Sequence, residues 1–584
     1  MRELASGVLG NGSLLATVSA RGELLGLWWP HPDREQHLGR LRIGLELSGR
    51  VHPLDEEPFE WTQRYLGDST ILRTVARSPR AMVEIDDLVL PDQPALVRRV
   101  SADVSAADAR VVVSCRPELG GRDTTLGAYV DESSGVLVFH RAPYALALTA
   151  AAVGEAAAEG FGRVEGTLAV ELDGGAELVC ALGDTPAAAI ELASSLRGTS
   201  FEQHAEARRR RDAARLAPAP PAETFELEPL YRRSVLVFDQ LADVETGAVV
   251  AAPELDPDFV HSGGYGFVWP RDLGFLALAF LASGQADLVE RALRWLAGAQ
   301  EPSGVWQQRH WTDGTPAATW CEHQLDETGT VLFAYEAAWR SLRDESLDEA
   351  LWPSARRAAD FLLTTLDDDG IPCATADLWE ERDGCHAYTA AATAAGLDAA
   401  ASFARRHEPE LAPHYEAAAA RVRAALDRCF WSEEHGRYLR TLGDPTVDVS
   451  LLGLAWPFRA VDPAGERMRA TATAVERALG RPGGGLLRYE GDVYAGGNPW
   501  VLGTLWLGLY RRGVGDVARH ARVLAYAREV ATPLGLLPEQ VTEDGAPAWV
   551  VPLAWSHAML VLAARPELDF APPLEETARE VVRD

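Results

Sequence analysis

The hydrophobic periodicity of this 584-residue chain changes near residue 225, and this change constrains the fold more than any other feature. From about residue 8 to about residue 200, short runs rich in Val, Leu and Thr alternate with turn segments, as in antiparallel sheets. After residue 225, long Ala-rich and Leu-rich stretches follow a period of about 3.6 residues, as in helices. The sequence therefore predicts a β domain followed by a helical domain, in keeping with a length that exceeds one compact core.

The first part of the chain consists of strand-length runs at intervals typical of an antiparallel β-sandwich. The expected strands are Ser13–Ser19, Leu41–Leu47, Leu72–Ala76, Met82–Leu88, Leu96–Val104, Arg110–Ser114, Val136–His140 and Thr167–Leu172. We expect this domain to occupy residues 1–200, and no cluster of catalytic residue types occurs within it.

A charged and Pro-rich segment follows at residues 201–225 and is predicted to be a linker. Its four arginines, 208–211, precede the Pro-rich run 217–221. Because Pro is excluded from helix interiors, this run is not expected to be helical. The arginines are expected on a solvated helix face, with an anion-binding patch as the alternative, and we assign them no function.

About twelve helical stretches fill the remainder of the chain. They are 227–243, Leu273–Leu281, Ala286–Ala299, Thr330–Leu342, 349–366, His386–Arg406, Pro413–Phe430, Leu451–Pro457, Pro463–Leu479, Pro499–Arg512, Val517–Ala531 and Leu553–Ala564. Twelve helices make six hairpins, which can close into an (α/α)6 barrel. We expect this barrel at 226–570 and a C-terminal tail at 571–584. Aromatic and acidic segments lie between the helices, where a scaffold usually carries its functional residues.

Composition limits the partners and the compartment. A net charge of −31, with Arg and no Lys among the cations, disfavours binding to nucleic acid or to an anionic membrane surface and suits a neutral partner such as a sugar. The six cysteines lack the close pairs of a zinc site and are expected to be free thiols. We find neither a basic segment followed by an apolar run at the N-terminus nor an apolar stretch of about 18 residues, so we expect a cytoplasmic protein.

Two short segments each present a carboxylate in a chain rich in Trp and Arg. They are Asp377–Arg382, with the sequence DLWEER, and Leu537–Gln540, with the sequence LPEQ. Hydrolysis of an acetal needs one carboxylic acid that protonates the leaving oxygen and one carboxylate that activates water or attacks the sugar. The pair therefore indicates a glycosidase.

Several segments between the predicted helices resemble glycoside hydrolase family 15, the family of glucoamylases, glucodextranases and trehalases. The matching motifs, in chain order, are Gly264–Asp272, Trp320–Asp326, Asp377–Arg382, Arg488–Tyr489 with Gly497–Trp500, and Pro538–Gln540 with Leu553–His557. Their joint occurrence in this order is far more specific than any one of them. The resemblance covers nearly the whole chain and implies the prokaryotic two-domain type, an exo-acting inverting α-glucosidase that releases β-glucose.

Carried over by position, the resemblance implies that Glu380 is the general acid and Glu539 the general base. Trp379 and Trp320 would supply apolar surroundings that raise the pKa of the acid. The implied substrate-binding residues are Tyr265, Trp269, Arg271, Asp272, Trp320, Trp379, Glu381 and Arg488. Structural alternatives are a helix-start acid for Glu380, a surface carboxylate for Glu539, and a salt bridge between Arg271 and Asp272.

The expected substrate is a small or oligomeric α-glucoside, such as a malto- or isomalto-oligosaccharide, and trehalose stays among the candidates. A disaccharide phosphorylase would need only one catalytic carboxylate, but Glu539 supplies a second and no phosphate cradle accompanies it. A sugar-binding protein without turnover is disfavoured because both carboxylates are present. We expect no cofactor and no metal, since no Ca²⁺-binding loop pattern occurs. The sequence determines neither the preferred linkage nor the oligomeric state.

Overall fold

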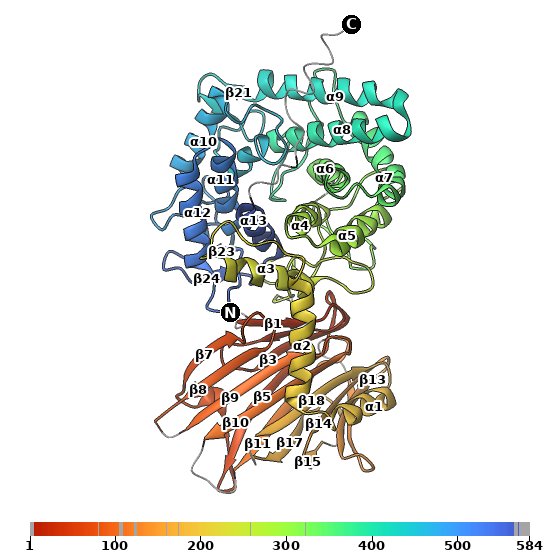
Figure 1. Cartoon of the computed structure of the whole chain (residues 1–584), viewed down its shortest axis with the longest axis vertical. Helices are drawn as coiled ribbons and strands as arrows, with labels where there is room; N and C mark the ends of the chain where they lie inside the picture. The colour runs from red at the N-terminus through yellow and green to blue at the C-terminus, as the bar shows by residue number, and fades with distance from the viewer. Residues whose placement is uncertain are drawn as a thin grey trace. The chain divides into compact units, whose positions relative to one another are not determined.

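The computed structural model describes residues 5–79, 81–103, 109–121, 125–152, 154–158, 160–172, 175–256, 259–321, 323–565 and 570. It divides the chain into two compact units (Figure 1). The first unit comprises Met1–Ala217, Val235–Glu245 and Pro253–Gly266, and the second comprises Pro218–Ser234, Thr246–Ala252 and Phe267–Asp584. The predicted tail at 571–584 and the end of one predicted strand, Val104, lie outside the described residues.

Antiparallel strands make up most of the first unit. They are β1 (Gly7–Gly10), β2 (Leu15–Val18), β3 (Leu24–His31), β4 (Arg34–Gln36), β5 (Leu38–Leu47), β6 (Arg50–Pro53), β7 (Glu60–Tyr65), β8 (Leu72–Arg77), β9 (Met82–Val89), β10 (Ala95–Asp103), β11 (Arg110–Pro117), β12 (Leu126–Asp131), β13 (Val136–Arg141), β14 (Tyr144–Ala150), β15 (Glu155–Ala157), β16 (Gly160–Gly162), β17 (Gly166–Glu171) and β18 (Ala176–Gly183). One sheet has the order β1-β2-β3-β5-β11-β17-β15, with β4 on β3 and β6 on β5, and the other has the order β16-β12-β13-β14-β18-β10-β9-β8-β7. This confirms the predicted antiparallel sandwich.

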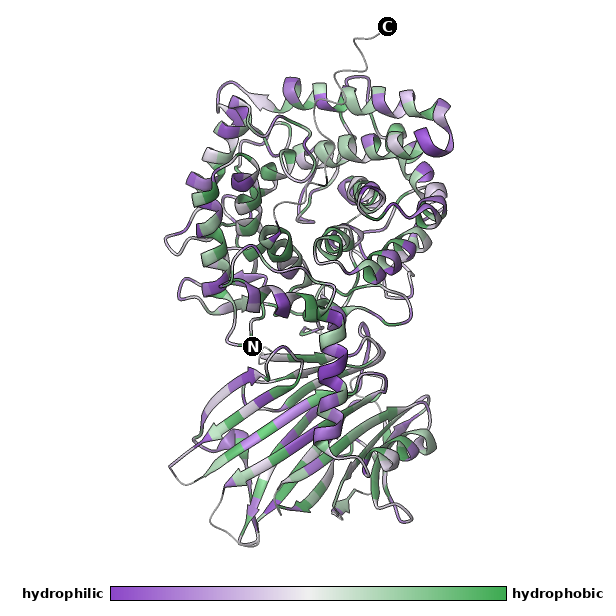
Figure 2. Cartoon of the chain, in the orientation of Figure 1, coloured by the Kyte–Doolittle hydropathy of each residue, from purple (hydrophilic) through white to green (hydrophobic). Residues whose placement is uncertain are grey.

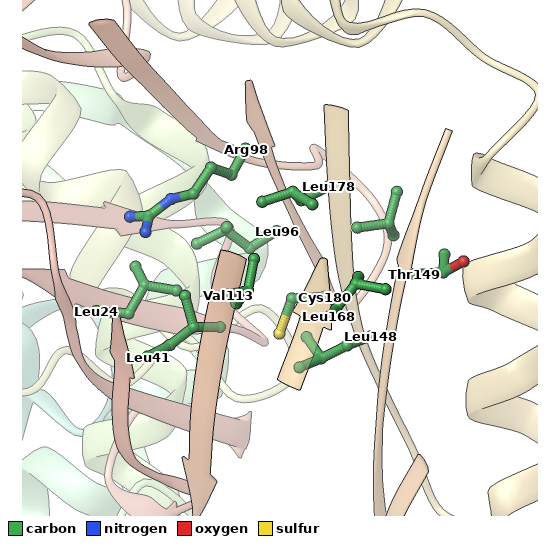
Figure 3. Close-up of a pocket in the computed structure, with 11 residues that line it drawn as sticks. Leu24, Leu41, Leu96, Arg98, Val113, Leu148, Thr149, Leu168, Leu178 and Cys180 are labelled. Carbon is green, nitrogen blue, oxygen red and sulfur yellow. The ribbon is translucent and has the colours of Figure 1, made fainter. Parts of the chain in front are cut away.

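The two sheets face each other across an apolar interior. Hydropathy alternates along the strands (Figure 2), as expected when successive side chains point to opposite faces. Leu24 and Val113 of one sheet and Leu96 and Cys180 of the other line a void of about 10 Å³ between the sheets (Figure 3). A void of this size is about that of one water molecule, so this void is too small for a sugar.

Two helices, α1 (Pro186–Leu196) and α2 (Phe201–Leu216), cover the outer face of the second sheet. The predicted linker is therefore helical over most of its length. A solvated face is the wrong prediction for Arg208, which is 1% exposed and donates from Nε to Asp212 at 2.9 Å. Arg209 and Arg210 do point into solvent. The sequence-based prediction placed the change from strand to helix periodicity near residue 225, whereas the helices α1 and α2 already lie before that residue.

Helices dominate the second unit (Figure 1). They are α3 (Glu228–Leu241), which spans the boundary between units, α4 (Pro270–Ala282), α5 (Ala286–Ala299), α6 (Leu325–Leu342), α7 (Glu345–Thr364), α8 (Ala387–His407), α9 (Ala412–Ala425), the 3-10 helix η4 (Val449–Leu454), α10 (Glu466–Leu479), α11 (Val501–Gly513), α12 (Val517–Val530) and α13 (Ala554–Ala564). Each helix coincides with one predicted stretch, and only the stretch at 451–457 forms a 3-10 helix instead of an α-helix. Within the described residues, no helix is long and apolar enough to cross a bilayer.

The helices alternate between an inner and an outer ring. Contacts run from α4 to α6, α8, η4, α11 and α13, and from α13 back to α4, which closes the inner ring. Outer helices α5, α7, α9, α10 and α12 each pack on an inner neighbour, and α3 joins α13 through a hydrogen bond between Ser234 and His557. The inner helices are buried on nearly all sides. This arrangement confirms the predicted (α/α)6 barrel.

Two glycines set the close approach of inner helices α6 and α8. A Cβ added to Gly329 would lie 2.3 Å from the backbone oxygen of Ala392, and one added to Gly396 would lie 2.8 Å from the Cα of Gly329. Contacts of this length with backbone atoms cannot be relieved by a side-chain rotation. The two helices must therefore separate if either glycine gains a side chain.

We expect Gly329→Ala to destabilise the helical unit by about 1–3 kcal/mol, the usual range for an overpacked core. Gly298→Ala on α5 is the matched control, because a Cβ there meets no atom within 4 Å. Alanine lowers the conformational entropy of the unfolded chain, so that variant should be neutral or slightly more stable. Calorimetry of both variants measures the difference, and equal unfolding temperatures would show that α6 and α8 tolerate a wider separation.

Candidate active site

The candidate residues occupy the segments that lead into the inner helices. Trp269 is the N-cap of α4, Gln324 of α6, His386 of α8, Trp500 of α11 and Leu553 of α13. Because an outer helix returns the chain between successive inner ones, the inner helices start at the same end of the barrel. Their N-termini carry partial positive charge, which favours carboxylates at this end.

Single β-bridges join these segments to one another. Val268 bridges His310, Leu486 bridges Trp500, and Trp500 bridges Gln540. The indole of Trp379 packs on that of Trp500, with ring centroids 5.6 Å apart. These contacts link the Glu380 turn to the Glu539 segment.

A tight turn presents Glu380. The strands β19 (Thr375–Ala376) and β20 (Asp383–Gly384) frame the turn, and the Glu380 N–H donates to the backbone oxygen of Asp377 at 2.9 Å. Arg440 donates to the Asp377 carboxylate at 2.7 Å and so holds the turn from outside. Glu380 has φ +65°, the left-handed region that costs energy for a residue with a Cβ. Such strain persists where surrounding contacts impose it, often at functional sites.

The Glu380 carboxyl lies in a nearly dry environment with only 13% of the side chain exposed. The indole N–H of Trp269 donates to Oε1 at 2.7 Å, and Arg271 lies 3.5 Å from the same atom. Burial raises the pKa of Glu380, and Arg271 and the Trp269 bond oppose this shift only in part. A carboxyl placed in this way is suited to hold a proton above the usual titration range.

Arg271 is surrounded by other carboxyl groups besides Glu380. Its guanidinium lies 3.1 Å from Asp326, 3.6 Å from Glu327 and 3.7 Å from Asp272. Burial raises the pKa of all three, to about 7 for Asp272. One guanidinium cannot balance this many buried negative charges, so the cluster retains protons near neutral pH. Asp272 Oδ1 has no hydrogen-bond partner in the structure and can accept from a ligand hydroxyl.

Glu539 is 3% exposed and is held by its backbone. Its N–H donates to Val550 and its carbonyl oxygen accepts from Val501, both at 3.0 Å, while Gln540 Nε2 donates to the carboxylate at 3.0 Å. Two residues of α13 hold the residues before Glu539. The Ser556 hydroxyl donates to the backbone oxygen of Pro538, and His557 accepts from the backbone N–H of Leu537. Glu539 is therefore a buried residue and not a surface-loop carboxylate.

His557 is a neutral part of this support. Its Nε2 accepts from the backbone N–H of Leu537 at 3.0 Å, so the proton lies on Nδ1, which donates to Ser234 at 2.8 Å. Burial lowers the pKa of His557 to about 3. The histidine therefore stays neutral near pH 7, keeps one tautomer and holds the Glu539 segment in place.

Glu381 and Arg488 form a second polar group beside the turn. Arg488 donates to Glu381 and to Asp492, at 2.8 Å and 2.7 Å, and Tyr489 donates to Glu381. The guanidinium lies over the Trp500 ring, 4.6 Å from its centroid. Glu381 keeps 33% of its side chain exposed, so it can still contact a ligand.

Only some of the predicted substrate-binding residues contact the Glu380 carboxyl. Trp269, Arg271 and Glu380 are in direct contact, whereas the Trp379 indole donates to Asp448 and not to Glu380. Trp320, 52% exposed, donates to the Glu380 backbone oxygen at 3.2 Å. The indole that bonds to the Glu380 carboxyl is thus Trp269, and neither Trp320 nor Trp379.

Tyr265 belongs to the first unit, and its role remains a sequence-based prediction. Gln308, Asp326 and Glu327 have no role predicted from the sequence, and all three are completely buried. Asp326 and Glu327 lie beside Arg271. Asp326 is the last residue of the Trp320–Asp326 motif, which was a usable signal, whereas Gln308 lies outside every motif. Among the described residues, no group of three or more His, Cys, Asp or Glu side chains is arranged to hold a metal ion.

Comparison with known proteins identifies the family. The model of the family described as "Glycosyl hydrolases family 15" matches residues 230–565, which is more than half of the chain. The chain belongs to glycosyl hydrolases family 15. This family 15 protein is therefore a glycoside hydrolase of glucoamylase-like type, and the matched residues include every candidate residue named above, Tyr265 among them.

Relatives of this family 15 glycosidase differ in length. An uncharacterized glycosyl hydrolase of Methanocaldococcus jannaschii is 26% identical over 95% of this chain and 97% of its own length. An isomaltose glucohydrolase of Kribbella flavida is 29% identical over 61% of this chain and 97% of its own length. A crystal structure of a bacterial glucoamylase complexed with acarbose matches with a TM-score of 0.86 over 100% of this chain and 97% of that one, at 20% identity, so it shows a shared fold.

Proposed function

We propose that this glycosidase is an exo-acting, inverting α-glucosidase that releases β-glucose from the non-reducing end of malto- or isomalto-oligosaccharides. Glu380 is the general acid in this proposal and Glu539 the general base. The observation that carries the proposal is the Glu380 carboxyl, which lies in a buried turn with φ +65° and contacts Trp269 and Arg271. Such surroundings are those of a carboxylic acid that stays protonated until it meets a leaving group.

The proposed reaction uses the two carboxyl groups from opposite sides of the sugar ring. Glu380 gives its proton to the glycosidic oxygen as the bond to the anomeric carbon breaks. Glu539 takes a proton from the water that attacks that carbon from the other face, so the configuration inverts. Asp272 and Arg271 would bind hydroxyls of the terminal glucose, because Asp272 Oδ1 is an unused buried acceptor.

Two neighbours support a short substrate. The relative named isomaltose glucohydrolase is 29% identical over 61% of this chain, and a related glycosidase variant, 26% identical over 59% of this chain, has been solved in complex with glucose. Isomaltose is therefore the first substrate to try, with maltose second. Trehalose is the alternative that the same family suggests.

The test follows the anomer of the released glucose. Purified protein is mixed with isomaltose, maltose, kojibiose or trehalose, with and without phosphate, and the products are followed by proton NMR before mutarotation. Initial β-glucose without phosphate supports inverting hydrolysis and identifies the linkage. Initial α-glucose would contradict inversion, and release only with phosphate would make the protein a phosphorylase.

Trp269→Phe should move the alkaline limb of kcat/KM to higher pH. The indole N–H stabilises the ionised form of Glu380 and thereby lowers its pKa, so its loss raises that pKa further. Because the acid acts when protonated, the active range should extend upward while maximal activity falls. The pH profile of isomaltose hydrolysis, compared with that of Trp431→Phe at a position away from the turn, measures the shift, and a shift to lower pH would contradict the assigned role of the bond.

A further inference from the structure

Arg309 is a buried cation packed among the aromatic rings beside the proposed acid. It is 5% exposed. Its guanidinium lies 4.2 Å from the centre of the Phe267 ring, 4.6 Å from that of Trp320 and 5.7 Å from that of Trp269. Both indoles contact Glu380, because Trp269 donates to its carboxyl and Trp320 donates to its backbone oxygen. A guanidinium that lies over aromatic rings and out of water is attracted to their faces.

The same side chain also holds the backbone in front of Trp320. Arg309 Nε and Nη2 donate to the carbonyl oxygen of Ala318 at 2.8 Å and 2.6 Å. The two stretches of backbone are joined as well, since the Ala317 N–H donates to the carbonyl oxygen of Arg309 at 3.0 Å. A planar guanidinium can present two N–H groups to one oxygen, which a lysine ammonium does not do. Trp320 is therefore held through its ring and through the backbone two residues before it.

The Trp320 indole keeps an open surface beside the acid. Arg309 lies over one face of the ring, and the indole N–H is used by the Glu380 backbone oxygen, yet 52% of the residue is exposed. The open part of the ring is therefore the face turned away from Arg309. An exposed side chain normally loses rotamer freedom when a ligand orders it, and a contact that orders it beforehand removes this cost of binding.

We infer that Arg309 is a positioning residue, which holds the Trp320 indole against the Glu380 turn as a preformed surface for the leaving sugar. The inference rests on the proposed function, in which Glu380 protonates the oxygen of that sugar, and on the substrate-binding role that the family resemblance implies for Trp320. Arg309 is buried, so it acts through the indole and not by touching the substrate. Its effect on turnover then depends on Trp320 and on the presence of a leaving sugar.

Two substitutions separate the shape of the guanidinium from its charge. Arg309→Met removes both and should lower kcat/KM on isomaltose by about 5- to 30-fold, the range of a desolvated cation–π contact, mainly through a higher KM. The charge of Arg309 also lowers the pKa of Glu380, and Arg309→Lys keeps that charge. Arg309→Lys should therefore keep the pH profile of the unchanged protein but still lose activity on isomaltose, because lysine lacks the planar fork. Full recovery of isomaltose hydrolysis in Arg309→Lys would overturn the inference.

The leaving group provides a second comparison. α-Glucosyl fluoride has no leaving sugar, so both Arg309 variants should hydrolyse it at nearly the rate of the unchanged protein. Arg467→Met is the matched control, because Arg467 of the outer helix α10 also lies over an indole, 4.8 Å from the ring centre of Trp431. Equal losses on isomaltose and on the fluoride would indicate a purely structural role and contradict the inference. A loss in Arg467→Met as large as that in Arg309→Met would contradict it too.

A double-mutant cycle with Trp320→Ala tests whether Arg309 acts through the indole. Once Trp320 is alanine, Arg309→Lys should cause no further loss on isomaltose, whereas additive losses would show that the two residues act independently. Glu380→Gln in the same series distinguishes the two possible failures. If Glu380→Gln shows no dependence on the leaving group, the proposed function fails and the inference fails with it. If Glu380→Gln shows that dependence and the cycle is additive, only the role of Arg309 fails.

Discussion

Glu380→Gln is expected to lower kcat/KM on isomaltose and maltose by about 10²- to 10⁴-fold, the range that general acid catalysis contributes. Activity on α-glucosyl fluoride should change little, because that leaving group needs no proton. The amide keeps an acceptor for the Trp269 indole, whose N–H lies 2.7 Å from Oε1. The turn should therefore keep its geometry, and the loss should reflect the missing proton.

Steady-state kinetics on the two substrate types measure this difference, and near-ultraviolet circular dichroism checks the fold. Glu434→Gln, at an exposed position of the same unit, is the control for the chemical change itself. Similar losses on the disaccharides and on the fluoride would count against Glu380 as the acid. They would point to a role in binding or folding.

Glu539→Gln is expected to lower activity on both substrate types by a similar factor, again about 10²- to 10⁴-fold. Water must be activated whatever group leaves, so an activated leaving group cannot compensate for the missing base. Glu543→Gln in the same connecting segment is the matched control, because Glu543 is exposed whereas Glu539 is 3% exposed. Activity near that of the unchanged protein in Glu539→Gln would end the assignment.

A smaller side chain at position 539 tests the geometry as well. With Glu539→Ala and α-glucosyl fluoride, azide can enter the space of the water and attack the anomeric carbon without a base. The product should be β-glucosyl azide, because azide would approach from the face opposite the leaving group. Formation of the α-anomer would place Glu539 on the wrong face for the proposed role.

The barrel could be predicted from the sequence because its helices are long and strongly periodic. All twelve predicted stretches are helical in the structure. Local interactions decide such elements, since a helix forms its hydrogen bonds within one segment. The predicted linker at 201–225 was different: its arginines appear solvated in sequence, and only packing on the sheet buries Arg208.

Motifs located the candidate site but could not describe its contacts. The order of the motifs along the chain indicated Glu380 and Glu539, because each motif is a short local pattern. The partners of Glu380 come from other segments: Trp269 lies 111 positions earlier and Trp320 lies 60 positions earlier. No local pattern records which of several tryptophans will reach a given carboxyl.

The sequence by itself determined the β-sandwich, the six helical hairpins and the two candidate carboxylates, because periodicity and short motifs are properties of single segments. Only the tertiary structure decided that Trp269 bonds to Glu380 and that Arg271 lies among buried carboxyl groups. Such contacts, and the desolvation that raises the pKa of Glu380, arise when segments far apart in the chain meet at one end of a barrel and exclude water.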